Sequence, residues 1–414
     1  MNYSFLITVS LALAWMFSPD SLVLQGNGAG LGTGLFLPAL VMGAVISSAC
    51  IFLLHHPGLN EVSDRTPSPP ATLIIASRLS LVLLLPTGML VTAGFTFNET
   101  FVHWFPNFGF SFLLLTSVLV LHLIGEKIAA AIQPVFIGTT FVCLLLLSIY
   151  GTGGGTEIQT TSAESPLFSI VPLTAATLVL FLGYDPVDGQ AAMQNRKYYW
   201  GAVGTGCLLF AFWALASLGN VDSAELAQST IPYSLAARGI LGQPGRIIIG
   251  IAIISGTLGC VNGLFILANR SLVPLVENFF LRFPSGKILK NRIYPLFFSV
   301  LIGTFMAIGM AGSDDLEIYI RGALMLWLLT VGVHCLTATR ILRILGKAIT
   351  GFGYTLSITL IFSTFYLIFS HPKNIQVLGF CCFALAASSI VSRGLLQLNR
   401  QMTNTNTQTQ QGEL

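Results

Sequence analysis

Two carboxylates lie inside a long apolar run, in the stretch Phe181-Leu-Gly-Tyr-Asp-Pro-Val-Asp188. A helix in lipid must satisfy its own backbone hydrogen bonds, because hydrocarbon offers no partner. Pro186 removes one amide donor and Gly183 adds freedom beside it, so we expect the helix to break here. Asp185 lies about 16 Å from the water boundary marked by Arg196, near the middle of a hydrocarbon core about 30 Å thick. An acid at that depth usually marks a pathway or a binding site, the alternative being a structural kink.

A second proline and acid interrupt the apolar run Tyr3–Gly26, at Phe17-Ser-Pro-Asp20. The glycine-rich run Gly28-Ala-Gly-Leu-Gly-Thr-Gly34 follows it and is a rival position for the same break. The distance from Phe36 to His55 leaves barely one crossing, which needs about 20 residues. Length therefore favours a break at 17–20. The glycine run would then begin the second span, as a face of small residues that packs closely.

The composition indicates a polytopic membrane protein. The chain has 414 residues, of which 54% are hydrophobic and only 8% charged, against about 25% charged in soluble domains. The net charge of +3 comes from basic residues scattered between apolar runs, so we expect no nucleic-acid partner. The seven cysteines and six histidines show no ligand spacing, which predicts no metal site, no disulfide framework and no cofactor.

The apolar runs predict about twelve membrane spans in one domain, residues 1–396, followed by a disordered tail at 397–414 that is rich in Gln, Thr and Asn. The first repeat would cover about 4–150, the second about 167–345, and two extra helices 352–391.

The Lys and Arg residues predict the orientation. They concentrate in the loops on the side of the two termini, whereas the other side carries Arg238, Arg246, Arg321 and Lys373. This asymmetry places both termini in the cytoplasm, and we expect a bacterial cytoplasmic (inner) membrane. Because no base precedes the first apolar run, a signal peptide is not expected.

The two interrupted spans are the first and the sixth. An offset of five spans, an odd number, means that the second half is inverted relative to the first. Paired broken helices in two inverted halves point to the binding site of a secondary transporter.

Four stretches resemble the amino acid–polyamine–organocation superfamily of permeases. Leu121-His-Leu-Ile-Gly-Glu-Lys-Ile-Ala-Ala-Ala-Ile-Gln133 is similar to its junction of spans four and five, and Phe181-Leu-Gly-Tyr-Asp185 to its sixth span. The run Ser255–Arg270 is similar to its eighth span, and Gly30-Leu-Gly-Thr-Gly-Leu-Phe36 to its first-span signature. The resemblance implies an all-α polytopic membrane protein with a 5+5 inverted-repeat (LeuT-like) fold and broken helices one and six.

The resemblance also implies a transporter, not an enzyme, for an amino acid or related amine, driven by protons or acting as an exchanger. Free amides at half-helix N-termini would hold a substrate carboxylate, and carbonyls near Leu182–Tyr184 would hold its ammonium. Asp185 would carry the proton, and Asp188 would relay it or cap the helix. The candidate substrate-binding residues are Phe17, Ser18, Asp20, Gly30, Gly32, Thr33, Gly34, Phe181, Leu182, Gly183 and Tyr184.

Three alternatives remain. Sodium coupling would use Ser255 and Thr257, although their spacing points the two hydroxyls in different directions on a helix. A membrane-embedded enzyme, such as a lipid-linked glycosyltransferase, would use Ser313-Asp-Asp-Leu-Glu317 to hold a metal and a diphosphate, but that loop is short. The third is a non-transporting helical subunit of a larger complex. As a transporter, the protein would be a monomer or homodimer in the lipid bilayer.

Overall fold

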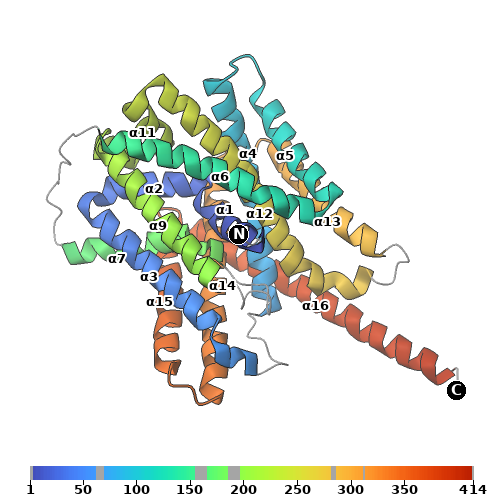
Figure 1. The fold of residues 1–414 in the computed structure, drawn as a ribbon. Helices are drawn as coiled ribbons and strands as arrows, with labels where there is room; N and C mark the ends of the chain where they lie inside the picture. Colours follow the sequence, from blue (N-terminus) through green and yellow to red (C-terminus); the bar gives the residue numbers. More distant parts are fainter. Residues whose placement is uncertain are drawn as a thin grey trace.

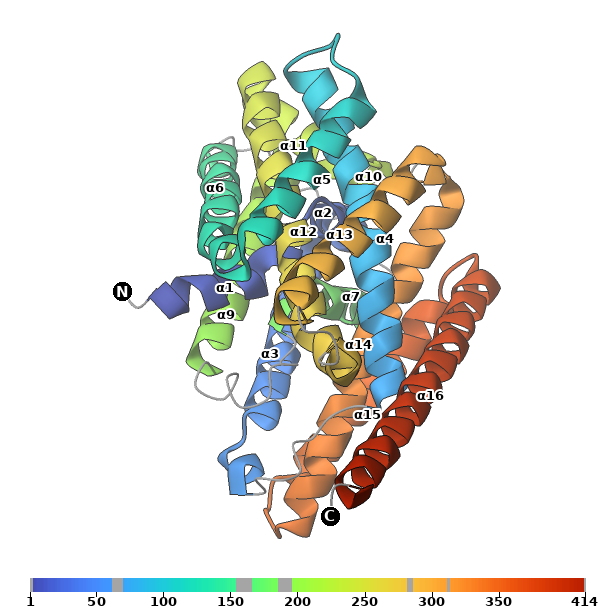
Figure 2. The same cartoon turned by 90° about the vertical axis from the view of Figure 1, so that its right-hand side faces the viewer.

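A computed structural model describes residues 3–61, 70–153, 166–184, 196–280, 286–310 and 313–412, and every regular element in these ranges is a helix. The helices form one bundle (Figure 1). We call the end with the connection between helices α4 and α5 the hairpin side, at the top of Figure 2. The opposite end, where α3 and α14 finish, is called the basic side because their loops carry lysines and arginines.

The first half contains an interrupted span and four further crossings. Its helices are α1 (Tyr3–Met16), α2 (Pro19–Gly32), the short η1 (Thr33–Leu35), α3 (Phe36–Leu54), η2 (Pro57–Glu61), α4 (Ala71–Thr100), α5 (Asn107–Ile124) and α6 (Glu126–Thr152).

The second half repeats this order with a second interruption. Its helices are α7 (Pro166–Leu180), η3 (Leu182–Tyr184), α9 (Arg196–Leu218), α10 (Ser223–Gln228), α11 (Pro232–Leu241), α12 (Gln243–Phe280), α13 (Gly286–Ala307) and α14 (Asp314–Ile344). The last two are α15 (Thr350–Phe369) and α16 (Asn374–Gly412).

Nine helical segments in the described part of the chain are long and apolar enough to cross a membrane. Three shorter apolar helices, Phe5–Met16, Ile170–Leu180 and Arg292–Ala307, correspond to parts of the first, sixth and ninth predicted spans. The interruptions therefore shorten the first and sixth spans. The boundaries of the two repeats stay a prediction.

The spans differ in how much surface they bury. α4, α12 and α14 are the most buried, whereas α5, α6 and α16 are the least. α12 packs against α4 and α6, and α14 against α4 and α15. The centre of the bundle is thus built from α4, α12 and α14, and α16 lies at its edge (Figure 2).

One boundary differs from that expected. The glycine run does not begin the second span: residues 28–32 lie in α2, the second half of span one, residues 33–34 lie in η1, and α3 begins only at Phe36. Its small residues do pack closely, Gly28 against Phe36, Gly30 against α10 and Gly32 against α7. α16 extends to Gly412, and the disorder expected for the tail stays a prediction.

Candidate functional site

The interruption of span one lies at Phe17 and Ser18, as the length argument predicted. α1 ends at Met16, and the Ser18 side chain caps α2 by accepting a hydrogen bond from the amide of Ser21 at 3.2 Å. Pro19 is the first residue of α2, where its missing N–H costs nothing. The amide of Leu22 donates to the carbonyl of Ser18 at 3.1 Å. The N-terminus of α2 is therefore largely closed by its own cap, and a substrate carboxylate has few free amides there.

Asp20 is the first acidic residue after the break, in the first turn of α2. It lines a cavity of about 530 Å³ enclosed by α2, α4, α7, α11 and α14. Its Oδ2 atom is buried and has no hydrogen-bond partner among the described residues. A buried oxygen without a partner costs about 1–3 kcal/mol, more when it is charged. We therefore expect the missing hydrogen-bond or ionic partner of the Asp20 carboxylate to be a proton or a ligand bound in the cavity.

The remainder of this cavity is mostly apolar, with one ion pair. Glu317 and Arg321 both line it, and their charged groups lie 3.8 Å apart one helical turn along α14. Thr92, Thr230 and Ser313 add hydroxyl groups. Among the described lining residues, two are acids and one is a base, so the cavity has a negative formal charge.

The interruption of span six faces α1. Phe181 and Leu182 are fully buried in the core, and a Cβ atom at Gly183 would overlap the carbonyl oxygen of Ala12. Gly183 thus permits the interruption of span six to touch α1 at Ala12. The backbone of η3 ends at Tyr184. Asp185 and Asp188, the predicted proton-coupling residues, lie outside the described residues.

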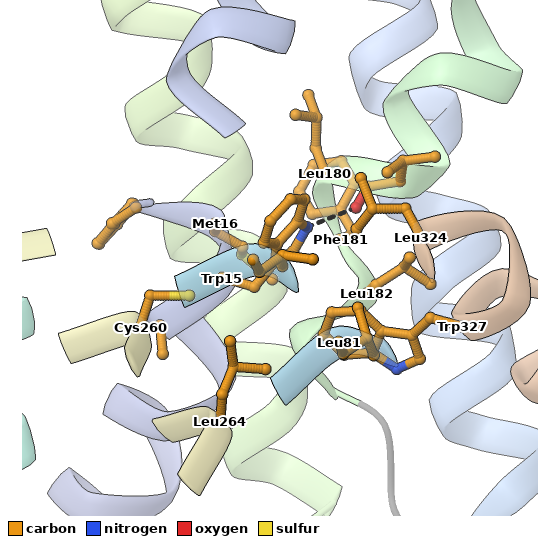
Figure 3. Close-up of a cluster of buried hydrophobic side chains, with 14 of the residues drawn as sticks. Trp15, Met16, Leu81, Leu180, Phe181, Leu182, Cys260, Leu264, Leu324 and Trp327 are labelled. Carbon is orange, nitrogen blue, oxygen red and sulfur yellow. Dashed lines mark hydrogen bonds between the residues drawn. The ribbon is translucent and has the colours of Figure 1, made fainter. Parts of the chain in front are cut away.

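A chain of aromatic contacts joins four spans at this level (Figure 3). Trp15 of α1 donates from Nε1 to the carbonyl of Val179 in α7 at 2.7 Å. The rings of Trp15 and Trp327 meet edge to face with centroids 6.1 Å apart. The guanidinium carbon of Arg78 in α4 lies 5.7 Å from the Trp327 ring centroid, which is cation–π distance. This chain holds α1, α4, α7 and α14 together where the helices break.

Arg78 was not identified from the sequence. It is 1% exposed and lies about 10 Å along α4 from Ala71. The sequence did contain a signal for Arg78, because it is the one charged residue in the apolar run 71–95. A charged residue inside a membrane span is a functional candidate by default.

The aromatic chain separates two cavities of unequal size. Trp15 and Trp327 line a cavity of about 70 Å³ together with Gly183 and Arg270, whereas Val179 borders the 530 Å³ cavity. In Figure 3 the two tryptophans lie beside the interruption with Leu180 and Leu182 around them. The structure therefore has a large cavity on the α11 side of the break and a small cavity on the opposite side of the aromatic chain, beside Gly183 and Arg270.

The remaining candidates in span one pack instead of lining the 530 Å³ cavity. Phe17 is fully buried, with its ring 6.2 Å from those of Phe141 and Phe210. A Cβ atom at Gly30 would overlap the backbone of α10, and one at Gly32 would press on Leu173 of α7. Thr33 has a φ of 42°, uncommon for a non-glycine residue, and Gly34 faces open space. The structure brings Asp20 to the cavity but not these residues.

The candidate cation residues separate into one bonded hydroxyl and one unbonded hydroxyl. Ser255 Oγ donates to the carbonyl of Phe136 in α6 at 2.8 Å. Thr257 is fully buried, and its Oγ1 has no partner among the described residues. Between them, Gly256 lies so close to the break that a Cβ atom would overlap the Phe17 carbonyl oxygen. A cation here would have the Thr257 hydroxyl oxygen and backbone carbonyls available, whereas the Ser255 hydroxyl already directs its proton to Phe136 and offers only its lone pairs. Among the described residues, no three His, Cys, Asp or Glu side chains form a metal-binding group.

A separate polar cluster, which we call the clamp, joins α5, α6 and α12. Asn262 donates from Nδ2 to Gln133 Oε1 at 2.7 Å and to the Ala129 carbonyl at 2.9 Å. Its Oδ1 lies 3.0 Å from His122 Nε2, and Gln133 Nε2 donates to the Gly259 carbonyl at 2.9 Å. These side-chain contacts satisfy both amides. The clamp was not predicted from the sequence.

The acidic run at the start of α14 does not converge on one site. Glu317 lines the 530 Å³ cavity, whereas Asp315 lines a different, apolar cavity beside α16. Since their carboxylates face two cavities, they do not form one metal and diphosphate site, as the enzyme alternative required.

No family model and no curated protein matches this sequence. Solved structures do match it over most of its length. A variant of the manganese transporter from Eremococcus coleocola superposes with a TM-score of 0.60 at 13% identity, covering 96% of this chain and 92% of that one. MhsT in complex with L-phenylalanine gives a TM-score of 0.51 at 15% identity, covering 92% and 98%.

A substrate-bound, outward-open sodium-coupled sialic acid symporter gives a TM-score of 0.52 at 14% identity, covering 88% of this chain and 89% of that one. Identities this low establish the fold and not the substrate. The chain is therefore an all-helical, multi-span membrane protein with the LeuT-like fold of these transporters, which confirms the fold class expected from the sequence.

Proposed function

We propose that this protein is a secondary transporter that binds an amino acid or related amine by its ammonium group at Asp20. The observation that carries the proposal is the buried, unpartnered Oδ2 of Asp20, beside the break in span one and facing the 530 Å³ cavity. A carboxylate at that position needs a proton or a cation to offset its burial. Transport then follows from exposing this site alternately to the two sides.

The fold alone does not identify the substrate. Its neighbours include a manganese transporter, a protein solved with L-phenylalanine and a sialic acid symporter. The charges of this chain's own cavity favour a cationic group near Asp20 and Glu317. A substrate carboxylate would be recognised by Arg321, because the amides at the start of α2 are engaged by Ser18. Membership of the amino acid–polyamine–organocation superfamily fits this reading.

Coupling to protons is part of the proposal, with Asp185 as carrier and Asp188 as relay or cap. The Asp185→Asn change would imitate the protonated state. It should leave substrate counterflow at equal pH intact but abolish accumulation driven by a pH gradient. Accumulation with normal pH dependence in that variant would remove Asp185 from the mechanism.

Sodium coupling is the second candidate, favoured by the unbonded Thr257 hydroxyl next in sequence to Gly256, which contacts the Phe17 carbonyl. Both candidates imply a transporter with cytoplasmic termini in a bacterial inner membrane, since the basic loops lie on the side of the termini. The hairpin side is then extracytoplasmic. Neither candidate needs an enzymatic activity or a partner subunit, so a monomer or homodimer suffices.

A thermal-shift screen of the purified protein tests the proposal. Amino acids, amines and divalent cations are each added with and without sodium, and a bound ligand raises the melting temperature by mass action. We expect a ligand with an ammonium group to stabilise the native protein but not Asp20→Asn. The matched control is Asp222→Asn, another aspartate at a helix start, which caps α10 away from the cavity. Equal stabilisation of Asp20→Asn and native protein would refute the role of Asp20.

A further inference from the structure

One cavity that the transport site does not use is a groove at the edge of the bundle. It has a volume of about 750 Å³ and lies between α16 and the helices α4, α13 and α14. Its walls are mainly aliphatic and aromatic, with Leu79, Leu83, Ile318, Phe380 and Phe383 as examples. This volume is within the range of pockets that hold an organic ligand, about 300–1,000 Å³.

The groove faces the membrane. α16 is the least buried of the candidate spans, and Phe383 on it is 71% exposed. Gly379 borders the groove, and a Cβ atom there would meet nothing within 4 Å. Since all the surrounding helices are apolar, hydrocarbon is what the bilayer places against this opening.

The dimensions indicate a chain thinner than a helix. From Gln376 to Val391 the groove follows α16 for about 22 Å, at 1.5 Å per residue. One leaflet of the hydrocarbon core is about 15 Å deep, half of about 30 Å. A helix with its side chains is about 10–12 Å across, whereas a single hydrocarbon chain is narrower and can lie along the length of the groove. A second copy of this chain therefore does not enter it, whereas an acyl chain does.

A carboxylate at one end of the groove favours a lipid with a positively charged headgroup. Asp315 and Gln376 both line the groove near the starts of α14 and α16, on the hairpin side, and both are exposed. Asp315 is the one residue among the described lining residues that carries a formal charge at neutral pH. A carboxylate at this end attracts an ammonium headgroup and repels a free fatty acid or an anionic glycerol headgroup.

We propose that this groove binds one acyl chain of a phospholipid from the hairpin-side leaflet, with the ammonium of a phosphatidylethanolamine headgroup against Asp315. The bound lipid would fill the space between α16 and the central helices. This site is separate from the transport cavity and does not depend on the proposed function.

Native mass spectrometry of the purified full-length protein tests this site, after exchange through nanodiscs with equal phosphatidylethanolamine and phosphatidylglycerol. We expect one retained phosphatidylethanolamine per chain, with a preference of about fivefold over phosphatidylglycerol. The change Gly379→Leu fills the groove and should lower that occupancy about tenfold. Gly394→Leu lies on the same helix in open space, does not line the groove, and should behave like the native protein.

Three results would overturn the proposal: no retained lipid on the native protein, unchanged occupancy in Gly379→Leu, or a lipid-free dimer that Gly379→Leu separates. If Gly379→Leu does not fold, Ala387→Phe fills the same groove. Asp315→Asn should keep the lipid but lose the headgroup preference, and added oleate should not displace it. Retained preference in Asp315→Asn would contradict the headgroup assignment.

Discussion

Two polar regions lie along α12, and they differ in whether their buried polar atoms have hydrogen-bond partners. Near the break in span one, several buried polar atoms lack partners among the described residues, including Asp20 Oδ2, Ser21 Oγ, Gln25 Oε1 and Thr257 Oγ1. In the clamp, the amides of Asn262 and Gln133 are both satisfied. Buried polar groups are nearly always paired in folded proteins, so a group of exceptions needs an explanation. The clamp is complete without a ligand, whereas we propose that a ligand completes the break region.

The comparison predicts opposite responses to substitution. Removing a partnered group in the clamp leaves other buried polar atoms unpaired and costs stability. Removing an unpartnered group near the break should cost little stability but should impair ligand binding. Stability and binding measured on the same variants therefore separate the two regions.

The largest effect on stability is expected for Asn262→Ala. This change leaves His122 Nε2 and Gln133 Oε1 without their partner in the core and removes a second bond to the Ala129 carbonyl, and should reduce the free energy of unfolding by about 3 kcal/mol or more. Asn269→Ala is the control, because Asn269 is partly exposed and bonds Glu126 at the end of the same packed region. It should cost less than about 1 kcal/mol. Thermal melting in detergent measures both, and a native-like melting temperature for Asn262→Ala would make the clamp dispensable.

An intermediate effect is expected for Trp15→Phe, which removes the one indole bond to Val179. We expect a loss of about 1–2 kcal/mol, from this hydrogen bond and from the smaller ring. Trp200→Phe is matched in kind, since its indole donates to the Ser48 carbonyl at 3.0 Å, but it lies at an exposed site. Equal melting temperatures for the two variants would show that the aromatic chain at the break contributes no special stability.

The smallest effect is expected for Thr257→Val, which keeps the shape of the side chain and removes an unpartnered hydroxyl. Its unfolding free energy without sodium should lie within about 0.5 kcal/mol of native. Thr140→Val is the contrasting change, because Thr140 donates towards both Phe136 and Ala252, and it should cost about 1 kcal/mol. If sodium stabilises the native protein and Thr257→Val equally, this hydroxyl is not a sodium ligand.

Sequence patterns located the interruptions well because these are local. Pro19 and Asp20 stand out in an apolar run, and the length from Phe36 to His55 admits one crossing. The glycine run was misplaced because close packing requires small residues on any helix. Composition alone did not distinguish the end of α2 from the start of α3.

The clamp and the aromatic chain were out of reach for a different reason. His122 and Asn262 are 140 residues apart, and Trp15 and Val179 are 164 apart. A single histidine or tryptophan in an apolar run cannot be distinguished from an ordinary core residue. Only the tertiary packing shows which residue it bonds to. Arg78 was the exception, because a charge inside a span is visible without knowledge of its neighbours.

The central claim is that Asp20 is the buried charge that binds the cationic part of the substrate. The most direct measurement is uptake into proteoliposomes of the ligand identified by thermal shift, for native protein, Asp20→Asn and Asp222→Asn. The account predicts that Asp20→Asn melts at or above the native temperature but transports with about 100-fold lower kcat/KM, the loss of roughly 2.7 kcal/mol for one charge-assisted contact. Asp222→Asn should transport normally. Native uptake by Asp20→Asn would contradict the account, because the unpartnered carboxylate would then serve no substrate.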